Sequence, residues 1–199
     1  MLPRTFFARP TLDVARSLLG MRLVHLDQGV RLAGIIRETE AYIGEEDNAC
    51  HARAGRTPRT AVMYGPPGHA YVYLNYGLHW LLNFVTEADG FPAAVLIRAI
   101  EPTEGLDWIS ARQGGRAPKD WANGPGKVSQ SLGINGALQG ADLCSPGVRL
   151  FIEAGTPFPE NRVTTTPRVG LNKVSEPWKS IHWRFVVKGE RDKELGIRN

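Results

Sequence analysis

Two neighbouring stretches of hydrophobic and polar residues near the N-terminus, residues 21–25 and 30–42, have the composition of β-strands. Residues such as Val, Ile, Thr and Tyr are typical of strands. The sequence Asp27-Gln28-Gly29 between the two stretches is a turn signal. The pattern therefore predicts two paired strands.

The second of these strands contains two acidic residues. The two-residue period of a β-strand places Glu38, Glu40 and Tyr42 on one face of the strand, and Thr39 and Ala41 on the other. We therefore expect the two carboxylates and the phenol to share one environment.

A β-hairpin is predicted between residues 70 and 85. The turn-rich sequence at 64–68 leads into a strand at 70–75, and a second strand-like run covers 78–85. The pair Tyr76-Gly77 lies between them, so we expect Tyr76 near the tip of the hairpin.

The rest of the pattern predicts a mixed fold. A short helix is expected over residues 11–20, with the Thr11 hydroxyl as N-cap, Asp13 in the first turn and Gly20 at the end. The other expected elements are strands at 93–100, 148–152 and 183–188, helices at 103–112 and 128–132, and a glycine-rich basic loop at 113–120. We expect an α+β fold, a single mixed domain over residues 1–199 with a curved, largely antiparallel β-sheet, flanking helices and a protruding β-hairpin.

Two polar residues interrupt apolar strands. Asn83 lies within Leu-Leu-Asn-Phe-Val and Arg98 within Leu-Ile-Arg-Ala-Ile. A buried guanidinium without a partner is costly, so Arg98 is expected to meet a carboxylate, for which Glu40 is a good candidate. An arginine keeps a carboxylate ionised, and an ionised carboxylate in a closed pocket can act as a general base towards water. Spacing does not distinguish Glu40 from Glu38, and both polar residues could instead point to a solvated face.

The charge and cysteine content narrow the class of protein. The chain has 24 Lys and Arg against 20 Asp and Glu, a formal net charge of +4, which allows a nucleic-acid partner without requiring one. Cys50 and Cys144 form neither a disulfide framework nor a zinc motif. No apolar stretch approaches membrane-spanning length and no export signal is visible. We expect a cytoplasmic protein, associated with the nucleoid if it is prokaryotic, that is not secreted and holds no metal.

All five tyrosines lie between residues 42 and 76, in a region that also contains His51, Arg53, Arg56 and Arg59. No acidic residue occurs from Asn48 to Thr86. Aromatic faces stack on unpaired bases and arginines hold phosphates, so this region is typical of a nucleic-acid surface. The alternatives are that tyrosines simply favour strands and that the arginines belong to a solvated loop.

The sequence Asn123-Gly124-Pro125-Gly126-Lys127 precedes a predicted helix and could hold a phosphate, or could be an ordinary helix cap. It is not a Walker A loop, because Trp121 replaces the first glycine and Val128 the required Ser or Thr. His51 has no second metal ligand or triad partner at suitable spacing, so we expect it to hydrogen-bond or stack on a ligand.

The ordered set of these motifs resembles the alkyladenine (3-methylpurine) DNA glycosylase family, from about Phe6 to the strand at 183–188. The residues that carry the resemblance are Glu38-Thr39-Glu40-Ala41-Tyr42, His51, Tyr71-Val72-Tyr73, Tyr76-Gly77, Asn83 and Leu96-Ile97-Arg98-Ala99. The resemblance implies a monofunctional enzyme of base-excision repair without metal or cofactor. It would flip an alkylated or deaminated purine out of double-stranded DNA and hydrolyse its N-glycosidic bond, and we expect it to act as a monomer and not on membranes.

The resemblance also implies residue roles. Glu40 matches the base that activates water, and Arg98 matches the residue that helps hold that water and the carboxylate. The substrate-binding positions are Tyr42, His51 and Tyr73, which sandwich the flipped base, and Asn83, which excludes normal guanine through its 2-amino group. The DNA-binding positions are Tyr76, which intercalates, with Arg53, Arg56 and Lys127 as backbone or pocket contacts. The alternative function is a non-catalytic protein that binds damaged or single-stranded nucleic acid with the same tyrosines.

Overall fold

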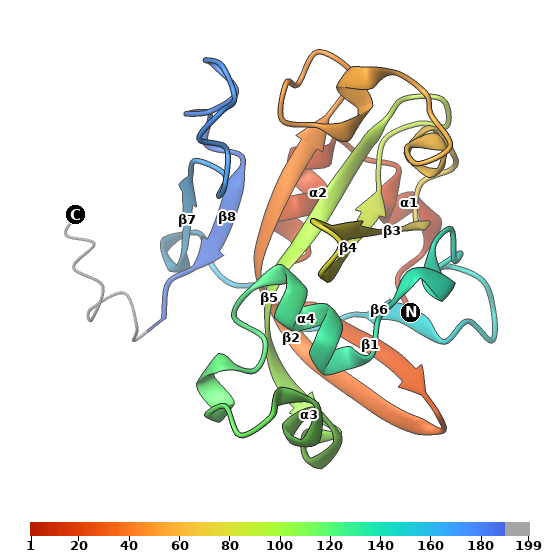
Figure 1. Ribbon diagram of the computed structural model, residues 1–199, viewed down its shortest axis with the longest axis vertical. Helices are drawn as coiled ribbons and strands as arrows, with labels where there is room; N and C mark the ends of the chain where they lie inside the picture. The colour runs from red at the N-terminus through yellow and green to blue at the C-terminus, as the bar shows by residue number, and fades with distance from the viewer. Residues whose placement is uncertain (190–199) are drawn as a thin grey trace.

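A largely antiparallel sheet of eight strands runs through the part of the chain that the computed structural model describes, residues 1–189 (Figure 1). The strands are β1 (Arg22–Asp27), β2 (Val30–Ile43), β3 (Ala70–Asn75), β4 (His79–Val85), β5 (Ala93–Glu104), β6 (Leu150–Glu153), β7 (Val163–Thr166) and β8 (Arg184–Val187). Their order is β3-β4-β5-β2-β1-β6, with β8 joining β2 to β7. The α+β fold expected from the sequence is confirmed, while residues 190–199 of the expected domain lie outside the described range.

Strand β2 is the centre of the sheet. One of its edges pairs with β5 from Ala33 to Ile43. Its other edge pairs first with β1, up to Ile35, and then with β8, from Glu38 to Glu40. Register shifts interrupt the β2–β5 ladder on both sides of Glu38, and such bulges bend a strand and increase its twist. The change of partner along β2 brings the C-terminal part of the chain to Glu38 and Glu40.

Helices flank the sheet. They are α1 (Arg4–Phe7), α2 (Thr11–Ser17), α3 (Leu106–Gln113) and α4 (Pro125–Leu132), with short 3-10 helices η1 (His51–Ala54), η2 (Ala61–Tyr64), η3 (Pro118–Asp120), η4 (Gly136–Leu138) and η5 (Glu160–Arg162). In Figure 1, α2 lies behind β2 and β5 while α4 lies in front of β5. The Thr39 hydroxyl donates to the carbonyl of Ala15 in α2 at 2.8 Å, so this face of β2 is turned towards the helix, as the alternation predicts.

Two hydrophobic clusters stabilise this arrangement. The larger cluster lies between the sheet and the helices and includes the fully buried Leu18, Leu32, Ile36, Phe84 and Ile97. The smaller cluster lies beneath η1 and the hairpin and is formed by Cys50, Ala52, Met63, Tyr71, Val85 and Ala94. This second cluster supports the aromatic residues of the candidate site.

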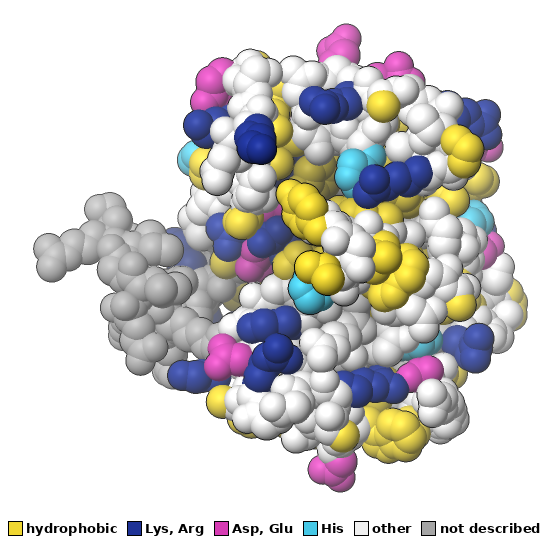
Figure 2. All heavy atoms as spheres, viewed as in Figure 1, with side chains coloured by type: hydrophobic (Ala, Val, Ile, Leu, Met, Phe, Trp, Pro, Cys, Tyr) yellow, Lys and Arg dark blue, Asp and Glu magenta, His cyan; other side chains and the backbone are white. Residues whose placement is uncertain are grey.

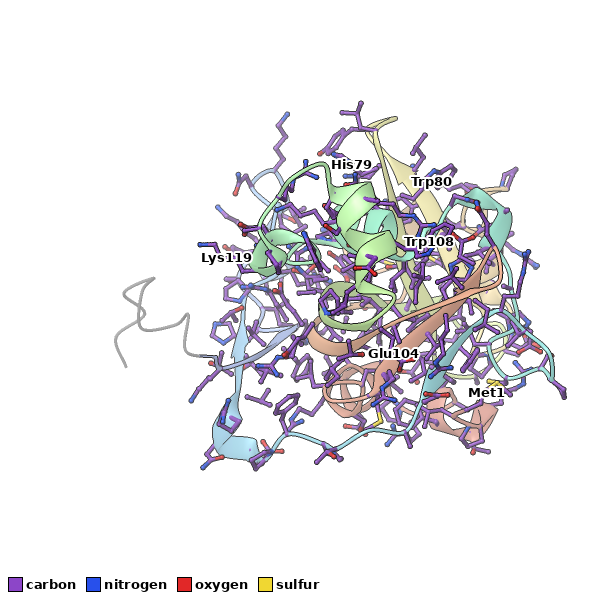
Figure 3. The ribbon with its side chains drawn as sticks, turned by 90° about the horizontal axis from the view of Figure 1, so that it is seen from below. Met1, His79, Trp80, Glu104, Trp108 and Lys119 are labelled. Carbon is purple, nitrogen blue, oxygen red and sulfur yellow. The ribbon has the colours of Figure 1, made fainter. Side chains whose placement is uncertain are left out.

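The hairpin β3–β4 and helix α4 approach each other closely. A Cβ atom on Gly126 would lie 2.9 Å from Cβ of His79, and one on Gly136 would lie 2.7 Å from the Trp80 ring. Figure 3 shows the side chains of His79 and Trp80 on this part of the molecule. Because only glycine fits at both positions, α4 and the turn after it can pack directly against the hairpin.

The hairpin prediction is confirmed. Tyr76 and Gly77 form the turn with positive φ angles of 49° and 70°, and the N–H of Leu78 donates to the carbonyl of Asn75. A positive φ is uncommon for a tyrosine, and Gly77 adopts it without steric cost. The turn at Gln28 and Gly29 also has positive φ angles, 50° and 81°, and joins β1 to β2 as predicted.

The predicted cap of the first helix is wrong. Thr11 is the first residue of α2 and Pro10 occupies the N-cap position. The Thr11 hydroxyl instead donates to Glu87 at 2.7 Å, and its backbone N–H donates to the same carboxylate at 2.6 Å. A tertiary partner therefore replaces the local cap and ties the helix to the β4–β5 turn.

The boundary between the strand at 93–100 and the helix at 103–112 is also wrong. Strand β5 continues to Glu104, which pairs with Ala33, and α3 starts only at Leu106. Gly105, with a φ of 71°, separates the two elements. Pairing with β2 extends the strand through a sequence of low strand propensity, so local pattern could not locate its end. The sequence also gave no indication of α1 or β7.

Candidate active site

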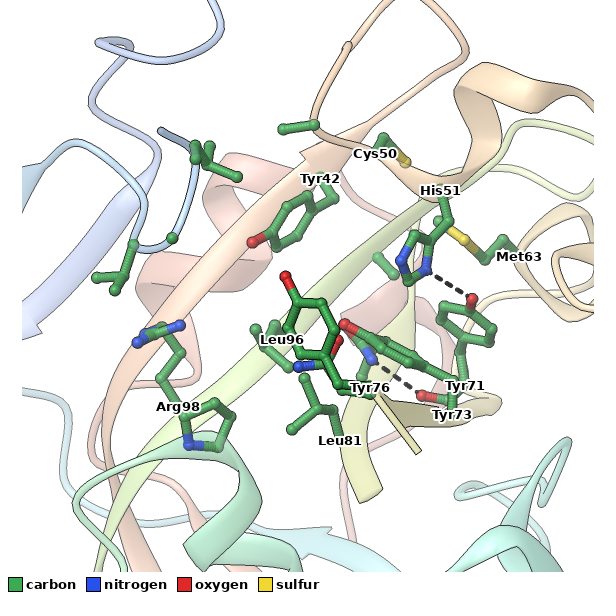
Figure 4. A pocket seen from close by; sticks show the side chains of 18 residues that line it. Tyr42, Cys50, His51, Met63, Tyr71, Tyr73, Tyr76, Leu81, Leu96 and Arg98 are labelled. Carbon is green, nitrogen blue, oxygen red and sulfur yellow. Dashed lines mark hydrogen bonds between the residues drawn. The ribbon is translucent and has the colours of Figure 1, made fainter. Parts of the chain in front are cut away.

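A cavity of about 230 Å³ opens where the hairpin, the end of β2, η1 and a C-terminal segment meet (Figure 4). Its lining includes Tyr42, Ala49, Cys50, His51, Met63, Tyr71, Tyr73, Asn75, Tyr76, Leu81, Asn83, Ala94, Leu96, Arg98, Pro125, Val169, Gly170 and Leu171. The substrate-binding residues expected from the sequence, Tyr42, His51, Tyr73 and Asn83, all line this one cavity. A concave pocket lined by aromatic and apolar side chains together with converging polar groups is the usual form of a small-ligand site.

Glu40 lies directly behind the wall of the cavity, with its side chain fully buried. Three residues that line the cavity donate hydrogen bonds to its carboxylate. The Tyr42 hydroxyl donates to Oε2 at 2.8 Å, Nη1 of Arg98 donates to Oε2 at 3.2 Å, and the backbone N–H of Val169 donates to Oε1 at 2.7 Å. Each carboxylate oxygen can accept two hydrogen bonds, so Oε1 keeps one acceptor position.

Burial raises the pKa of Glu40 above its ordinary value, while the charge of Arg98, the N–H of Val169 and the Tyr42 hydroxyl lower it. All three partners are donors, and donors stabilise the ionised form of a carboxylate. The pKa of Tyr42 lies well above its ordinary value, first because the phenol is buried and then because Glu40 is next to it. Tyr42 therefore stays protonated and remains a donor.

The two glutamates of β2 have different surroundings. Oε1 of Glu38 accepts from Nε of Arg98 and from Nε of Arg184, both at 2.7 Å. The predicted pairing of Arg98 with Glu40 is confirmed, although its shorter contact is with Glu38. Arg98 does not point to a solvated face, because its side chain is only 13% exposed.

Asn83 is buried as well, and its side chain is fixed by the neighbouring strand. Its Nδ2 donates to the backbone carbonyl of Tyr71 at 3.0 Å, and the two residues are paired across the β3–β4 hairpin. The apolar side chains of Leu81 and Leu96 line the cavity with it. Asn83 thus places an amide in an otherwise apolar part of the wall.

His51, Tyr71 and Tyr73 form one aromatic corner of the cavity. The His51 and Tyr73 rings are 4.6 Å apart at an angle of 76°, and those of Tyr71 and Tyr73 are 5.3 Å apart. Burial, together with Arg59 and Arg53, lowers the pKa of His51 to about 4, so the ring is neutral at physiological pH. Arg59 contacts Nε2 at 3.4 Å and can only donate, so Nδ1 carries the proton that His51 donates to the Tyr71 hydroxyl at 2.9 Å.

Tyr76 stands at the mouth of the cavity. Its side chain is 91% exposed at the hairpin tip, and Leu78 beside it is 74% exposed. Figure 2 shows hydrophobic side chains at the centre of this face, next to Lys, Arg and His side chains. Exposed large apolar groups of this kind mark a binding surface.

The other expected DNA contacts, Arg53, Arg56 and Lys127, do not line the cavity. Nζ of Lys127 donates to Oδ1 of Asn123 at 2.8 Å near the start of α4. Arg56 lies 5.9 Å from the centre of the Tyr64 ring, and Arg53 donates to the carbonyl of Asn48 at 3.3 Å. None of these three cations lines the cavity, whereas Arg98 does.

Residues 168–175, here called the strap, cross one side of the cavity and are held by a buried ion pair. Arg168 donates to Oδ2 and Oδ1 of Asp47 at 2.5 and 2.8 Å, and both side chains are fully buried. The guanidinium also donates to the carbonyl of Ala41 at 2.9 Å and lies 4.7 Å from the centre of the Tyr42 ring. The next residue of the strap, Val169, donates its backbone N–H to Glu40.

No role in this site was assigned to Asp47, Tyr71 or Val169 from the sequence. The period of two that joins Tyr71 to Tyr73 was a usable signal, because it places both on one face of β3. Asp47 and the strap had no comparable signal, since their contacts span more than 120 residues of sequence.

Within residues 1–189, no three His, Cys, Asp or Glu side chains are grouped so that they could hold a metal ion. In the same range, no helix is both long enough and apolar enough to cross a membrane.

Comparison with known proteins shows which family this chain is similar to. Residues 5–191 match the model of the family described as Methylpurine-DNA glycosylase (MPG). A protein of Methanocella arvoryzae is 50% identical over 189 residues, which cover 94% of this chain and 92% of the relative. Proteins of Myxococcus xanthus and Carboxydothermus hydrogenoformans are 46% and 45% identical, over 98% and 96% of this chain and 94% and 97% of their own lengths. All three bear the name "Putative 3-methyladenine DNA glycosylase".

The buried pair Arg168–Asp47 generates a prediction about stability. Asp47→Ala leaves a buried guanidinium without its counter-charge, so we expect the free energy of unfolding to fall by ~3–5 kcal/mol. Glu160→Ala is the control, because Glu160 pairs with Arg16 where the Glu160 side chain is 92% exposed. The control should lose no more than ~1 kcal/mol. Urea denaturation of both variants measures the difference, and equal losses would contradict the role given to the buried pair.

Proposed function

The chain belongs to the methylpurine-DNA glycosylase family, and from that premise we propose that it removes damaged purines from double-stranded DNA by hydrolysing their N-glycosidic bond. The relatives' names support 3-methyladenine as a substrate. Alkylation at N3 leaves a purine cationic and therefore a good leaving group. Deaminated purines such as hypoxanthine are the second substrate class that we propose.

The observation that carries this proposal is the buried Glu40 carboxylate behind an aromatic cavity, with three donors that favour its ionised form. Glu40 is the general base that takes a proton from the attacking water. Arg98 holds the carboxylate and the water, and a water that enters between Arg98, Tyr42 and Val169 can use the open acceptor position of Oε1. The same negative charge stabilises the oxocarbenium-like sugar in the transition state, as in other glycoside hydrolysis.

The aromatic residues bind the flipped base. We propose that Tyr42 covers one face of the base and that His51 and Tyr73 cover the other, since all three line the same cavity. The Asn83 amide lies in the wall that the edge of the base would approach, and there it excludes guanine by contact with the 2-amino group. A base can be attacked only after it leaves the stack, and a damaged pair opens at lower cost.

The exposed residues around the opening hold the DNA. Tyr76 intercalates into the gap that the flipped nucleotide leaves, which offsets part of the cost of unstacking. Arg53, Arg56 and Lys127 contact the DNA backbone around the cavity. With water as the nucleophile, the enzyme leaves an abasic site and needs no Schiff base, metal or cofactor. We propose further that it acts in the cytoplasm as a monomer, with residues 1–199 forming one glycosylase domain.

Glu40→Gln removes the general base while preserving the size of the side chain, and its amide oxygen keeps one of the two acceptor atoms of the carboxylate. We expect the single-turnover rate of excision from duplexes that contain 3-methyladenine, hypoxanthine or 1,N6-ethenoadenine to fall roughly 10²- to 10⁴-fold. Glu45→Gln is the matched control, because Glu45 is exposed and bonded to Tyr64 outside the cavity. An equally active Glu40→Gln would remove Glu40 from the mechanism. A wild-type protein that binds all three lesions and excises none would instead support a non-catalytic binding protein.

Tyr42→Phe tests the titration of Glu40. The rate requires ionised Glu40, so it falls as the pH drops through the pKa of that carboxyl. The Tyr42 hydroxyl lowers this pKa, so its loss raises the pKa further and moves the acid limb of the rate profile to higher pH. Tyr64→Phe, which also removes a hydroxyl bonded to a glutamate, should leave the limb in place. Identical limbs for wild type and Tyr42→Phe would mean that another group controls the rate.

Tyr76→Ala tests intercalation. Stacking on a base contributes ~1–3 kcal/mol, so we expect the dissociation constant for lesion-containing duplex to rise roughly 5- to 150-fold. Tyr76→Phe keeps the ring and should bind nearly as tightly as the wild type. Fluorescence anisotropy with lesion and undamaged duplexes gives both values, and unchanged binding by Tyr76→Ala would exclude intercalation by this residue.

A further inference from the structure

A second cavity, of about 510 Å³, adjoins the first on the side of η1. Its lining residues are Asn48, Ala49, Cys50, His51, Arg53, Ala54, Thr57, Arg59, Thr60, Tyr76, Lys173 and Val174. Four of them, Ala49, Cys50, His51 and Tyr76, also line the cavity proposed to bind the base. A nucleotide whose base occupies the first cavity therefore brings its own backbone to the second.

The charges that line the second cavity are all positive. Arg53, Arg59 and Lys173 are basic, and none of the described residues in its lining is acidic. His51 adds no charge, because its pKa is lowered to about 4. The first cavity differs, since the carboxylate of Glu40 lies immediately behind its wall. The second cavity is therefore suited to an anion that lies beside an uncharged or cationic group in the first.

The two sides of the second cavity come from distant parts of the sequence. Arg59 lies on the segment between η1 and η2, and Lys173 lies on the strap. Nδ2 of Asn48, which lies just before η1, donates to Oγ of Ser175 in the strap at 2.9 Å. Arg59 and Lys173 line the same cavity, so both can contact a single group bound there.

Arg59 is already oriented in the structure. Its guanidinium contacts Nε2 of His51 at 3.4 Å and lies 5.0 Å from the centre of the Tyr73 ring. A guanidinium has five N–H donors, so this contact leaves donors for a phosphate. An oriented donor loses less conformational entropy on binding than a free side chain. Through these contacts, Arg59 connects an anion in the second cavity to His51 and Tyr73 of the first cavity.

We propose that the second cavity is the binding site for the DNA phosphodiester that directly flanks the flipped nucleotide, with Arg59 and Lys173 as its two charged contacts. This inference rests on the proposed function, because it takes the first cavity as the site of the flipped base. The Lys173 ammonium contacts the phosphate as a point charge on a flexible side chain. The planar Arg59 guanidinium contacts it through oriented N–H donors. The two contacts fix the backbone on one side of the rotating nucleotide and so position its sugar next to Glu40.

The test pairs a change in the protein with a change in the DNA. The dissociation constant is measured for a duplex with a tetrahydrofuran abasic analogue, which is not cleaved, using wild type, Lys173→Met and the control Lys179→Met. Lys179 is an exposed lysine beyond the strap that lines neither cavity. We expect Lys173→Met to weaken binding roughly fivefold, as for a single exposed ion pair, and to lower the salt slope by about one. Lys179→Met should change neither value.

Uncharged methylphosphonates then replace single phosphates, first on either side of the abasic analogue and then several nucleotides away. With a methylphosphonate at one of the two flanking positions, wild type and Lys173→Met should bind equally. The inference is overturned if Lys173→Met binds like wild type, if Lys179→Met weakens binding equally, or if the difference persists with both flanking positions neutral. Excision of 3-methyladenine by the wild type is measured separately. Its absence would refute the proposed function, whereas excision without the Lys173 effect refutes only this inference.

Discussion

Burial of the Glu40 carboxylate is the constraint on which the rest of the site depends. A charge removed from water must be balanced nearby, and around Glu40 three carboxylates are matched by three arginines. Glu38 pairs with Arg98 and Arg184, Glu40 shares Arg98, and Asp47 pairs with Arg168. A buried pair of this kind gives little net stability but strongly disfavours any arrangement that breaks it. Its main effect is therefore to specify one geometry for the carboxylate.

This requirement explains why the C-terminal part of the chain returns to β2. Strand β8 carries Arg184 to Glu38, and the strap carries Arg168 to Asp47. Once Arg168 is fixed, the N–H of Val169 meets Glu40, and the guanidinium packs against the rear of Tyr42. A single set of ion pairs therefore places the Glu40 carboxylate, the Tyr42 ring and the strap at the edge of the cavity. Local changes in the strap would act on all three.

The sequence predicted the parts of this design that depend on local pattern. Alternation placed Glu38, Glu40 and Tyr42 together, the Tyr76-Gly77 turn marked the hairpin tip, and the polar interruption at Arg98 required an acidic partner. The parts that depend on distant contacts were not predictable. Asp47 and Arg168 are 121 residues apart in the sequence. The Thr11 hydroxyl does not cap its own helix and donates to Glu87. The end of β5 was missed for the same reason, because pairing with β2 decides it.

The arginines also change how the aromatic walls interact with a charged base. Arg168 lies 4.7 Å from the centre of the Tyr42 ring and Arg59 lies 5.0 Å from that of Tyr73. A ring whose face already interacts with a cation attracts a second cation on its other face less strongly, because the two cations repel each other through the ring. Stacking alone therefore gives a cationic purine little advantage over a neutral one. In the mechanism proposed above, the negative charge of Glu40 supplies that advantage and acts on the sugar as well as on the base. In that mechanism the aromatic walls select flat purines by shape, and the buried carboxylate responds to the positive charge that develops as the glycosidic bond breaks.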